Sequence, residues 1–494
     1  MKNTAEPSRA QPGGWMLALG GVCSVLYALL LMPRALERLK LGLSDWAFDV
    51  AFFHNLIFHA SRGDGFVQTA STHELDGLLE LSHAFFLLPA YVPIYRAWPE
   101  LSTLVAFQVW MLALSVVPLM ALGLRRGLSP WAVGLLALSF WSAPPLLRLG
   151  LADLNPLLLG IPLLLGVAWS LEAASRPVCL LLVLLACAVR EELPILVASL
   201  TVVQGLLGRV SRRRVLEVLA VCVIFFVVSA ALRPRVSFYI PFLRPWELWS
   251  QALSQPESGV PFTRKLEHLS TYFPSGQWGA LLAPMSWLMQ LPLLAYQLFV
   301  SGYEWWHWRG PYVHHLALLF PLVALCSLEG VSRLHGWLSR GPAWMRWGPE
   351  SLLLLGVLMQ LPSAEVALRE PLGQLDSADE QLLRVSRARG VETLLAQIPP
   401  DAPVASDYVW MARLSGRPVQ YAYQASFLEQ STVQEDGRVT PGLDQVTYLL
   451  LDETHEHWRQ RMEQREDWQR VGSADGYRLY RNMPLKTSEQ QPQR

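Results

Sequence analysis

Long runs without a charged residue constrain the fold of this chain more than any other feature. The run from Trp15 to Pro33 contains 19 residues, and a helix of about that length crosses the roughly 30 Å hydrocarbon core of a bilayer. A signal peptide would need an A-x-A-like cleavage site, which this run lacks, so we interpret it as a first membrane span. Further uncharged runs cover residues 81–95, 101–124, 127–147, 154–171, 177–189, 193–208, 218–232, 268–303, 310–328 and 351–364.

These runs predict a polytopic α-helical membrane protein with about ten membrane segments. Several runs are shorter than the roughly 20 residues of a straight span, so we expect broken helices inside the bundle. The positive-inside rule places three arginine clusters in the cytoplasm: Arg125 with Arg126, residues 212–214, and Arg333 with Arg340 and Arg346. The loops at residues 34–80, 148–153, 190–192 and 301–311 then face outward. This orientation requires residues 81–95 to be re-entrant or to span only half of the bilayer.

Charged residues are distributed unevenly along the chain. They make up 16% of all residues, whereas soluble proteins have about 25%. Lys and Arg number 40 and Asp and Glu number 40, so the chain lacks the net basic charge typical of nucleic-acid binding. Residues 363–494 alone hold 20 acids and 15 bases, which indicates a soluble, slightly acidic tail. All five cysteines lie in apolar runs, where we expect core residues rather than disulfides.

We therefore expect a cytoplasmic N-terminus (1–14), a membrane domain (15–362) with an outer loop at 34–80, an extracytoplasmic α/β domain (363–484) and a disordered end (485–494). Residues 44–59 mix apolar and ionisable residues round a helix, as an interfacial amphipathic helix does. The α/β domain is predicted to contain helices at residues 379–398 and 455–466 and strands at residues 403–406, 418–421, 445–452 and 477–481.

Ionisable residues within or beside membrane segments are costly, so each is a candidate for function. Asp49 follows the first span at the outer face, where its carboxylate could act as a general base or bind a divalent cation. The alternative is a carboxylate that only caps or solvates an interfacial helix. His54, His59 and His83 lie nearby in the sequence and are weaker candidates, because a single histidine is more often structural.

Two further groups interrupt apolar sequence. Asp153 either belongs to an outward-facing site or caps a helix before Pro156. Arg190, Glu191 and Glu192 interrupt the apolar stretch 177–208, which predicts a helical hairpin whose tip reaches the outer face and a polar cavity. Arg190 could bind a phosphate there while the glutamates bind a cation or orient hydroxyl groups. An internal ion pair that fixes the hairpin is the other interpretation.

A last group, Tyr312–His315, stands at the outer start of a late apolar segment. His314 and His315 could contact a phosphate or transfer a proton, or could only form hydrogen bonds at the interface. A zinc site is disfavoured, because adjacent histidines on a helix point in different directions and the segment has no HxxxH spacing. The sequence therefore does not define a metal site, and the one cofactor that its carboxylates would suit is a divalent cation.

Together these motifs resemble a family of prokaryotic predicted membrane proteins known as domain of unknown function 2079. The family's FD segment, HF segment, DFHP-like loop, KED-like hairpin tip and HY-containing late span correspond to residues 48–49, 83–85, 153–156, 190–192 and 312–315. The resemblance continues into the tail, at residues 398–421. Three positions depart from the pattern, which has an acid at His54, a histidine at Asn155 and a lysine at Arg190. Loss of the acid at position 54 argues against a two-carboxylate metal site.

The family in turn resembles the GT-C superfamily of membrane glycosyltransferases, which take a sugar from a polyprenyl-phosphate donor. This resemblance implies that Asp49 is the base, that Arg190 and His314 hold the donor phosphate, and that Asp153, Glu191, His54 and His83 help to bind substrate. The partners would be a polyprenyl-phosphate-linked sugar, membrane lipid and an unknown acceptor at the outer face of a bacterial cytoplasmic membrane. Two alternatives remain: a transporter or lipid-binding protein without catalysis, and a membrane anchor for the tail.

Overall fold

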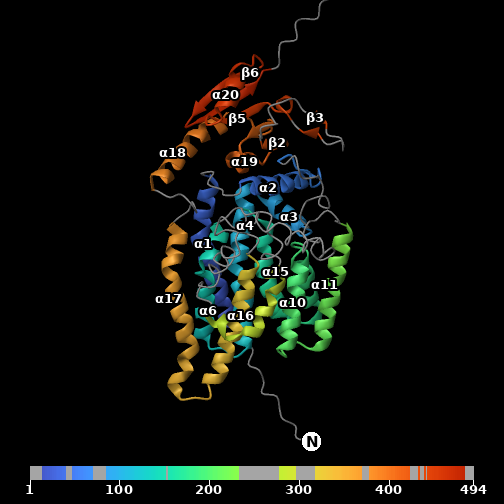
Figure 1. The fold of residues 1–494 in the computed structure, drawn as a ribbon, viewed down its shortest axis with the longest axis vertical. Coiled ribbons are helices and arrows are strands. Elements are labelled where there is room, and N and C mark those ends of the chain that lie inside the picture. Colours follow the sequence, from blue (N-terminus) through green and yellow to red (C-terminus); the bar gives the residue numbers. More distant parts are fainter. Residues whose placement is uncertain are drawn as a thin grey trace, which may run out of the picture.

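A bundle of helices and a smaller domain with a β-sheet make up this protein, as the ribbon in Figure 1 shows. The computed structural model describes residues 14–40, 47–70, 85–151, 154–232, 278–295, 317–369, 378–422, 432–433, 439–440 and 442–483. We call the bundle the membrane domain, and residues 378–483 the tail domain. The predicted polytopic helical protein with a small C-terminal α/β region is confirmed.

Within the described residues, five helical stretches are long and apolar enough to cross a membrane. They are α1 (Gly14–Lys40), α4 with α5 (Leu101–Leu114 and Val116–Arg125), η2 with α8 (Pro156–Leu159 and Gly160–Ala173), α11 (Arg212–Leu232), and η10 with α17 (Ala343–Trp347 and Gly348–Arg369). The bent pair α6 (Pro130–Trp141) and α7 (Pro144–Leu151), with an angle of 53°, provides a sixth if it is one span. Large parts of the predicted segments 268–303 and 310–328 lie outside the described residues.

The surface of the bundle fits a lipid environment. Apolar side chains such as Leu30 on α1, Ile224 on α11 and Leu355 on α17 are exposed. Such extended apolar surface is rare on soluble monomers. Helices with such exposed apolar side chains are suited to contact with the lipid chains of a bilayer.

Several elements are too short to cross a bilayer, as the short runs predicted. Residues 88–97 form η1 (Leu88–Ala90) and α3 (Tyr91–Ala97). A helix of 7 residues is only about 10 Å long, so this segment does not cross the membrane. The hairpin predicted at 177–208 is present as α9 (Arg176–Cys187) and α10 (Leu193–Leu206).

Helix α16 (Leu319–Leu338) is the most enclosed helix of the bundle, because every residue from Leu319 to Val331 is buried. It packs against α8, η4 (Trp278–Leu282) and η5 (Pro284–Met289), and α15 (Leu291–Ala295) follows η5. A Cβ atom on Gly330 would overlap the carbonyl oxygen of Gly279, and one on Gly279 would lie 2.7 Å from the carbonyl oxygen of Ser327. The two backbones can approach this closely only because both residues are glycine.

Helix α2 (Ala47–Arg62) lies across the end of the bundle, beneath the tail domain (Figure 1). The sequence predicts an interfacial amphipathic helix here. The structure differs, since most residues of α2 are buried. The reason is that α2 is packed between α3 of the membrane domain and α19 (Tyr408–Leu414) of the tail domain. Apolar residues all round a helix are suited to burial on both sides.

The tail domain has a five-stranded sheet of order β2-β1-β5-β7-β6. Strands β1 (Val404–Ser406), β2 (Gln420–Ala422) and β5 (Tyr448–Asp452) are parallel, and β5, β7 (Tyr477–Asn482) and β6 (Trp468–Ala474) are antiparallel. Helices α18 (Ala378–Leu395) and α20 (Glu456–Glu463), the turn η12 (Leu443–Gln445) and a small pair, β3 (Thr432–Val433) and β4 (Val439–Thr440), complete it.

All four predicted strands and both predicted helices of the tail are present, whereas β3, β4, β6 and α19 were not predicted. Strand β6 is an edge strand with mostly exposed residues and a register shift between Arg470 and Gly472, so it lacks a regular apolar alternation. Helix α17 continues through Pro362 to Arg369, past the expected domain boundary at residue 362.

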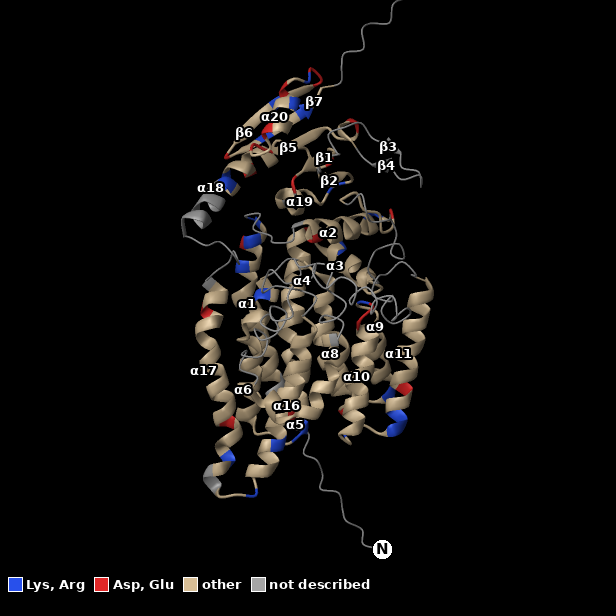
Figure 2. Cartoon of the chain, in the orientation of Figure 1, with Lys and Arg blue, Asp and Glu red and all other residues tan. Residues whose placement is uncertain are grey.

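Figure 2 shows that Lys and Arg gather at the ends of α11, α16 and α17 that lie farthest from the tail domain. We call this the arginine-rich end of the bundle. The clusters at residues 212–214 and at Arg340 and Arg346 belong to it. The positive-inside rule predicts that this end is cytoplasmic and that the tail domain lies outside.

The close approach of Gly279 and Gly330 generates a prediction about stability. We expect Gly330→Ala to destabilise the protein by about 2 kcal/mol or more, because α16 and η4 must separate to admit the methyl group. Gly336→Ala, on the same helix, meets no atom within 4 Å and should be neutral or stabilising by up to about 1 kcal/mol. Thermal unfolding in detergent measures the difference, and equal midpoints for the two variants would contradict the packing described here.

Candidate functional site

One face of α2 is directed toward the tip of the hairpin between α9 and α10. Asp49 lies in the first turn of α2, and Phe53 follows one turn later on the same side of the helix. The ring of Phe53 meets that of Phe85 edge to face, with 5.0 Å between centroids. Cζ of Arg190 lies 5.9 Å from the Phe85 centroid. The Phe85 ring therefore stands between the Asp49 face of α2 and the hairpin tip.

The hairpin tip holds three charged residues away from water. Arg190, Glu191 and Glu192 are 3%, 0% and 6% exposed. Nε of Arg190 lies 3.2 Å from Oε2 of Glu192 and 3.6 Å from Oε1 of Glu191. The predicted hairpin and the ion-pair interpretation of its tip are both present in the structure. A phosphate contact by Arg190 remains a prediction.

The backbone next to the tip is fixed to the segment that carries Phe85. The amide of Leu87 donates a hydrogen bond of 2.8 Å to the carbonyl oxygen of Ala188. Because Phe85 and Leu87 belong to the same short segment, this bond sets the position of the Phe85 ring over Arg190. The charged tip, the aromatic ring and α2 thus form one packed unit.

Three of the predicted site residues, His83, Asp153 and His314, lie outside the described residues, as does the rest of the Tyr312–His315 group. Asn155 is described and is buried. Its side-chain Oδ1 accepts a hydrogen bond of 3.0 Å from the backbone amide of Leu157, and this bond caps η2. Its backbone amide donates to Oε1 of Gln108 at 2.8 Å. The cap before Pro156, considered for Asp153, is therefore provided by Asn155.

His54 is buried between the two domains. It follows Asp49 by five positions, roughly 140° round the helix, so it points to a different side of α2. Its Nδ1 lies 2.7 Å from Oγ of Ser415 in the tail domain, and its Nε2 lies 2.9 Å from the hydroxyl of Tyr95 on α3. Both ring nitrogens therefore contact protein groups, which favours a role in docking the tail domain over direct contact with substrate.

The hydroxyl of Ser415 defines the tautomer of His54. Ser415 donates its own proton to the carbonyl oxygen of Ala412 at 2.8 Å, so its Oγ accepts from Nδ1–H of His54 and Nε2 accepts from the Tyr95 hydroxyl. Burial lowers the pKa of His54 to about 3. The imidazole is consequently neutral near pH 7, as this hydrogen-bond pattern requires.

Further contacts on α2 bind the same tail segment. Nδ2 of Asn55 donates to the carbonyl oxygen of Arg417 at 3.0 Å, and its Oδ1 accepts from the amide of Thr69 at 2.9 Å. Nε2 of His59 lies 3.1 Å from the carbonyl oxygen of Pro418. No local pattern in the sequence indicates this interface, because its partners are more than 350 residues apart and each is an ordinary polar residue by itself.

The described residues contain no group of three or more His, Cys, Asp and Glu side chains placed to hold a metal ion. Asp49 is half-buried at the start of α2, and the position of the family's second acid is taken by His54, whose ring nitrogens are engaged. A role of Asp49 as a base or as a cation ligand remains a prediction.

The chain matches the profile of the predicted membrane protein family DUF2079 over residues 41–484, and it belongs to that family. No curated protein matches the sequence. Two crystal structures of ArnT from Cupriavidus metallidurans have a similar fold. The structure bound to undecaprenyl phosphate has a TM-score of 0.59 at 12% identity and covers 97% of this chain and 99% of ArnT. The apo structure has a TM-score of 0.54 at 13% identity, with coverage of 94% and 98%. At this identity the likeness shows the fold alone: the chain has an ArnT-like fold.

Docking of the tail domain should depend on pH, because the docked state requires a neutral His54 imidazole. An undocked, hydrated histidine has a pKa near 6.5, whereas docking lowers the pKa to about 3. The undocked state binds more protons between these values, so docking should weaken as pH falls from about 6.5, by up to about 1.4 kcal/mol per pH unit. Fluorescence energy transfer between labels on the two domains measures the change.

His54→Gln can still donate to Ser415 and accept from Tyr95, and it should flatten this pH response. His59→Gln is the matched control and should retain it. Comparing the two curves separates His54 from other groups such as Asp407, whose pKa burial raises to about 6. An unchanged distance between the domains down to pH 4.5 in the unmodified protein would contradict the prediction.

Proposed function

We propose that this member of the family is an integral membrane glycosyltransferase of GT-C type, which transfers a sugar from a polyprenyl-phosphate donor to an acceptor at the outer face of the bacterial cytoplasmic membrane. The observation that carries the proposal is the placement of the Asp49 face of α2 against Phe85 and the charged hairpin tip. It is supported by the fold shared with ArnT, one structure of which is bound to undecaprenyl phosphate.

In this proposal Asp49 is the general base. Its carboxylate takes the proton of an acceptor hydroxyl while that oxygen attacks the anomeric carbon of the donor sugar. The bond between the anomeric carbon and the phosphate oxygen breaks, and the lipid phosphate leaves with the bonding electrons. The half-buried position of Asp49 limits competition from water for the proton.

Arg190 is proposed to bind the donor phosphate, whose negative charge grows as the bond breaks. Its ion pairs with Glu191 and Glu192 hold the guanidinium in one orientation, which reduces the entropy lost when the phosphate binds. The glutamates would also repel the phosphate, so the guanidinium has to be shared between them and the ligand. Glu191 is further proposed to orient sugar hydroxyls, with Asp153, His83 and His314 completing the substrate site.

Asp49 provides the central test. Purified protein is supplied with a panel of polyprenyl-phosphate sugars and candidate acceptors, and released lipid phosphate is measured. We expect Asp49→Asn to lower kcat by about 10²–10⁴-fold, the usual effect of losing a general base. Glu100→Gln, an exposed acid at the start of α4, is the control and should retain activity. Equal turnover by Asp49→Asn would refute the catalytic role, and donor binding without turnover by any variant would favour the non-catalytic alternative.

Arg190 gives a second test that separates binding from stability. Arg190→Gln leaves two buried carboxylates without their cation and should destabilise the protein by about 3–5 kcal/mol. Arg190→Lys keeps the charge but loses the planar fork, so we expect near-normal stability and a KM for the donor raised about tenfold. Steady-state kinetics and thermal unfolding measure both effects. A donor KM that is unchanged in both variants contradicts the phosphate contact.

A further inference from the structure

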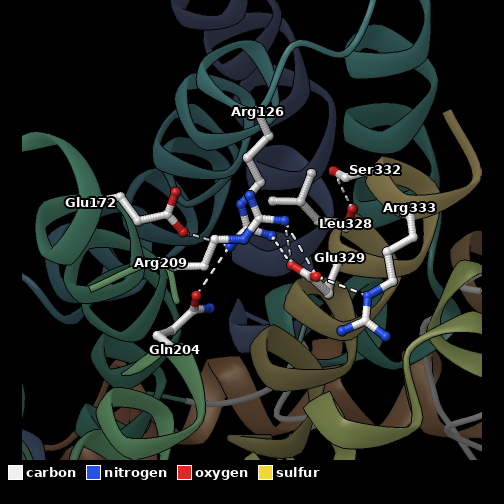
Figure 3. Close-up of polar contacts among 8 residues, drawn as sticks. All are labelled: Arg126, Glu172, Gln204, Arg209, Leu328, Glu329, Ser332 and Arg333. Carbon is white, nitrogen blue, oxygen red and sulfur yellow. Dashed lines mark hydrogen bonds and ion pairs between the residues drawn. The ribbon is translucent and has the colours of Figure 1, made fainter. Parts of the chain in front are cut away.

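A network of buried ion pairs ties helices together at the arginine-rich end (Figure 3). Glu329 of α16 is its centre. Its carboxylate accepts from Nη1 of Arg126 at 3.0 Å, from Nε of Arg333 at 3.0 Å and from Nη2 of Arg209 at 3.2 Å. The Glu329 side chain is only 4% exposed, so three guanidinium groups converge on one carboxylate that has little contact with water.

Arg126 extends the network to two more helices. Its Nη2 donates to Oε1 of Glu172, near the end of α8, at 2.6 Å and to Oε1 of Gln204 on α10 at 3.3 Å. The side chains of Arg126 and Glu172 are 1% and 7% exposed. In the sequence, Arg126 and Arg333 indicate only the orientation of the chain, because nothing local shows that residues 203 or more positions apart meet at Glu329.

The charges of this network do not balance. Arg126, Arg209 and Arg333 contribute three positive charges, and Glu172 and Glu329 contribute two negative ones. The excess positive charge lies on Arg209 and Arg333, because Arg126 is buried against both acids. The network is therefore suited to an additional anion.

Arg209 and Arg333 are the members that such an anion can reach. Their side chains are 33% and 39% exposed. Arg333 contacts Glu329 through Nε, and Figure 3 shows its two terminal nitrogens turned away from the carboxylate. Within the described part of the chain, neither arginine forms an ion pair with any acid other than Glu329. Glu329 thus holds Arg209 through Nη2 and Arg333 through Nε, which leaves further N–H groups of both guanidinium groups for a ligand.

We propose that Arg209 and Arg333, positioned by Glu329, form a binding site for the phosphate of an anionic phospholipid headgroup. The planar guanidinium matches phosphate oxygens in geometry. A lipid source is favoured because Arg209 lies just before α11, a helix with an exposed apolar surface, and basic pockets between membrane helices on the cytoplasmic side bind such headgroups. The site is at the opposite end of the bundle from Asp49 and does not depend on the proposed glycosyl transfer.

Arg213 provides a matched control within the same region. Its side chain is 80% exposed on α11 and pairs with Glu217 one turn away. Replacing it removes the same charge from the same end of the bundle without touching Glu329. A general attraction between basic residues and anionic lipid would respond to all three substitutions alike, whereas a built site would not.

The full-length protein in nanodiscs tests the proposal, with native mass spectrometry to count retained phosphatidylglycerol against phosphatidylcholine. We expect Arg209→Gln and Arg333→Gln each to weaken phosphatidylglycerol retention about tenfold, the loss expected for a charge-assisted contact, and Arg213→Gln to change it less than about twofold. Arg333→Lys, which keeps the charge, should lose an intermediate amount. Equal losses in all three glutamine variants, or no preference for phosphatidylglycerol, would overturn the proposal.

Inorganic phosphate distinguishes the source of the ligand. Competition between inorganic phosphate and phosphatidylglycerol, with phosphatidylglycerol binding more tightly, supports a headgroup site. Thermal stabilisation by inorganic phosphate alone, lost in Arg209→Gln and unaffected by phosphatidylglycerol, would overturn the lipid assignment in favour of a soluble anion.

Discussion

Charged side chains removed from water have to be paired, and this constraint determines how both ends of the bundle are built. At the tip of the hairpin between α9 and α10, the guanidinium of Arg190 is buried beside Glu191 and Glu192. At the arginine-rich end, Glu329 is enclosed with three guanidinium groups. The second cluster has an excess of positive charge, whereas the first places a single guanidinium beside two acids. In both clusters the ion pairs fix the orientation of the buried side chains.

Helix α2 connects the membrane domain to the tail domain because both of its faces are covered. One side carries Asp49 and Phe53 toward Phe85 and the hairpin tip. The other carries His54, Asn55 and His59, which hold the segment from Ser415 to Pro418. The rotation of α2 about its axis, and with it the direction of Asp49, is consequently tied to docking of the tail domain.

Much of the fold could be predicted because its signals are local. The apolar runs indicate the spans, the three charges at 190–192 indicate the hairpin tip, and a short apolar run indicates the strand β5. The candidate site was predicted only as a set of residues. Asp49 and the hairpin tip are now connected through Phe85, whereas His54 is engaged with Tyr95 and Ser415, and His83, Asp153 and His314 lie outside the described residues.

The sequence by itself determined that this is a helical membrane protein with a small α/β tail, because the length of an apolar run and the positions of arginines follow directly from the residues. It also determined which ionisable residues are costly and therefore of interest. Only the tertiary structure decided their partners. His54 meets Ser415 across 361 positions and Arg126 meets Glu329 across 203, and no local pattern specifies such pairs, because they form only when packing of the apolar helices brings them together.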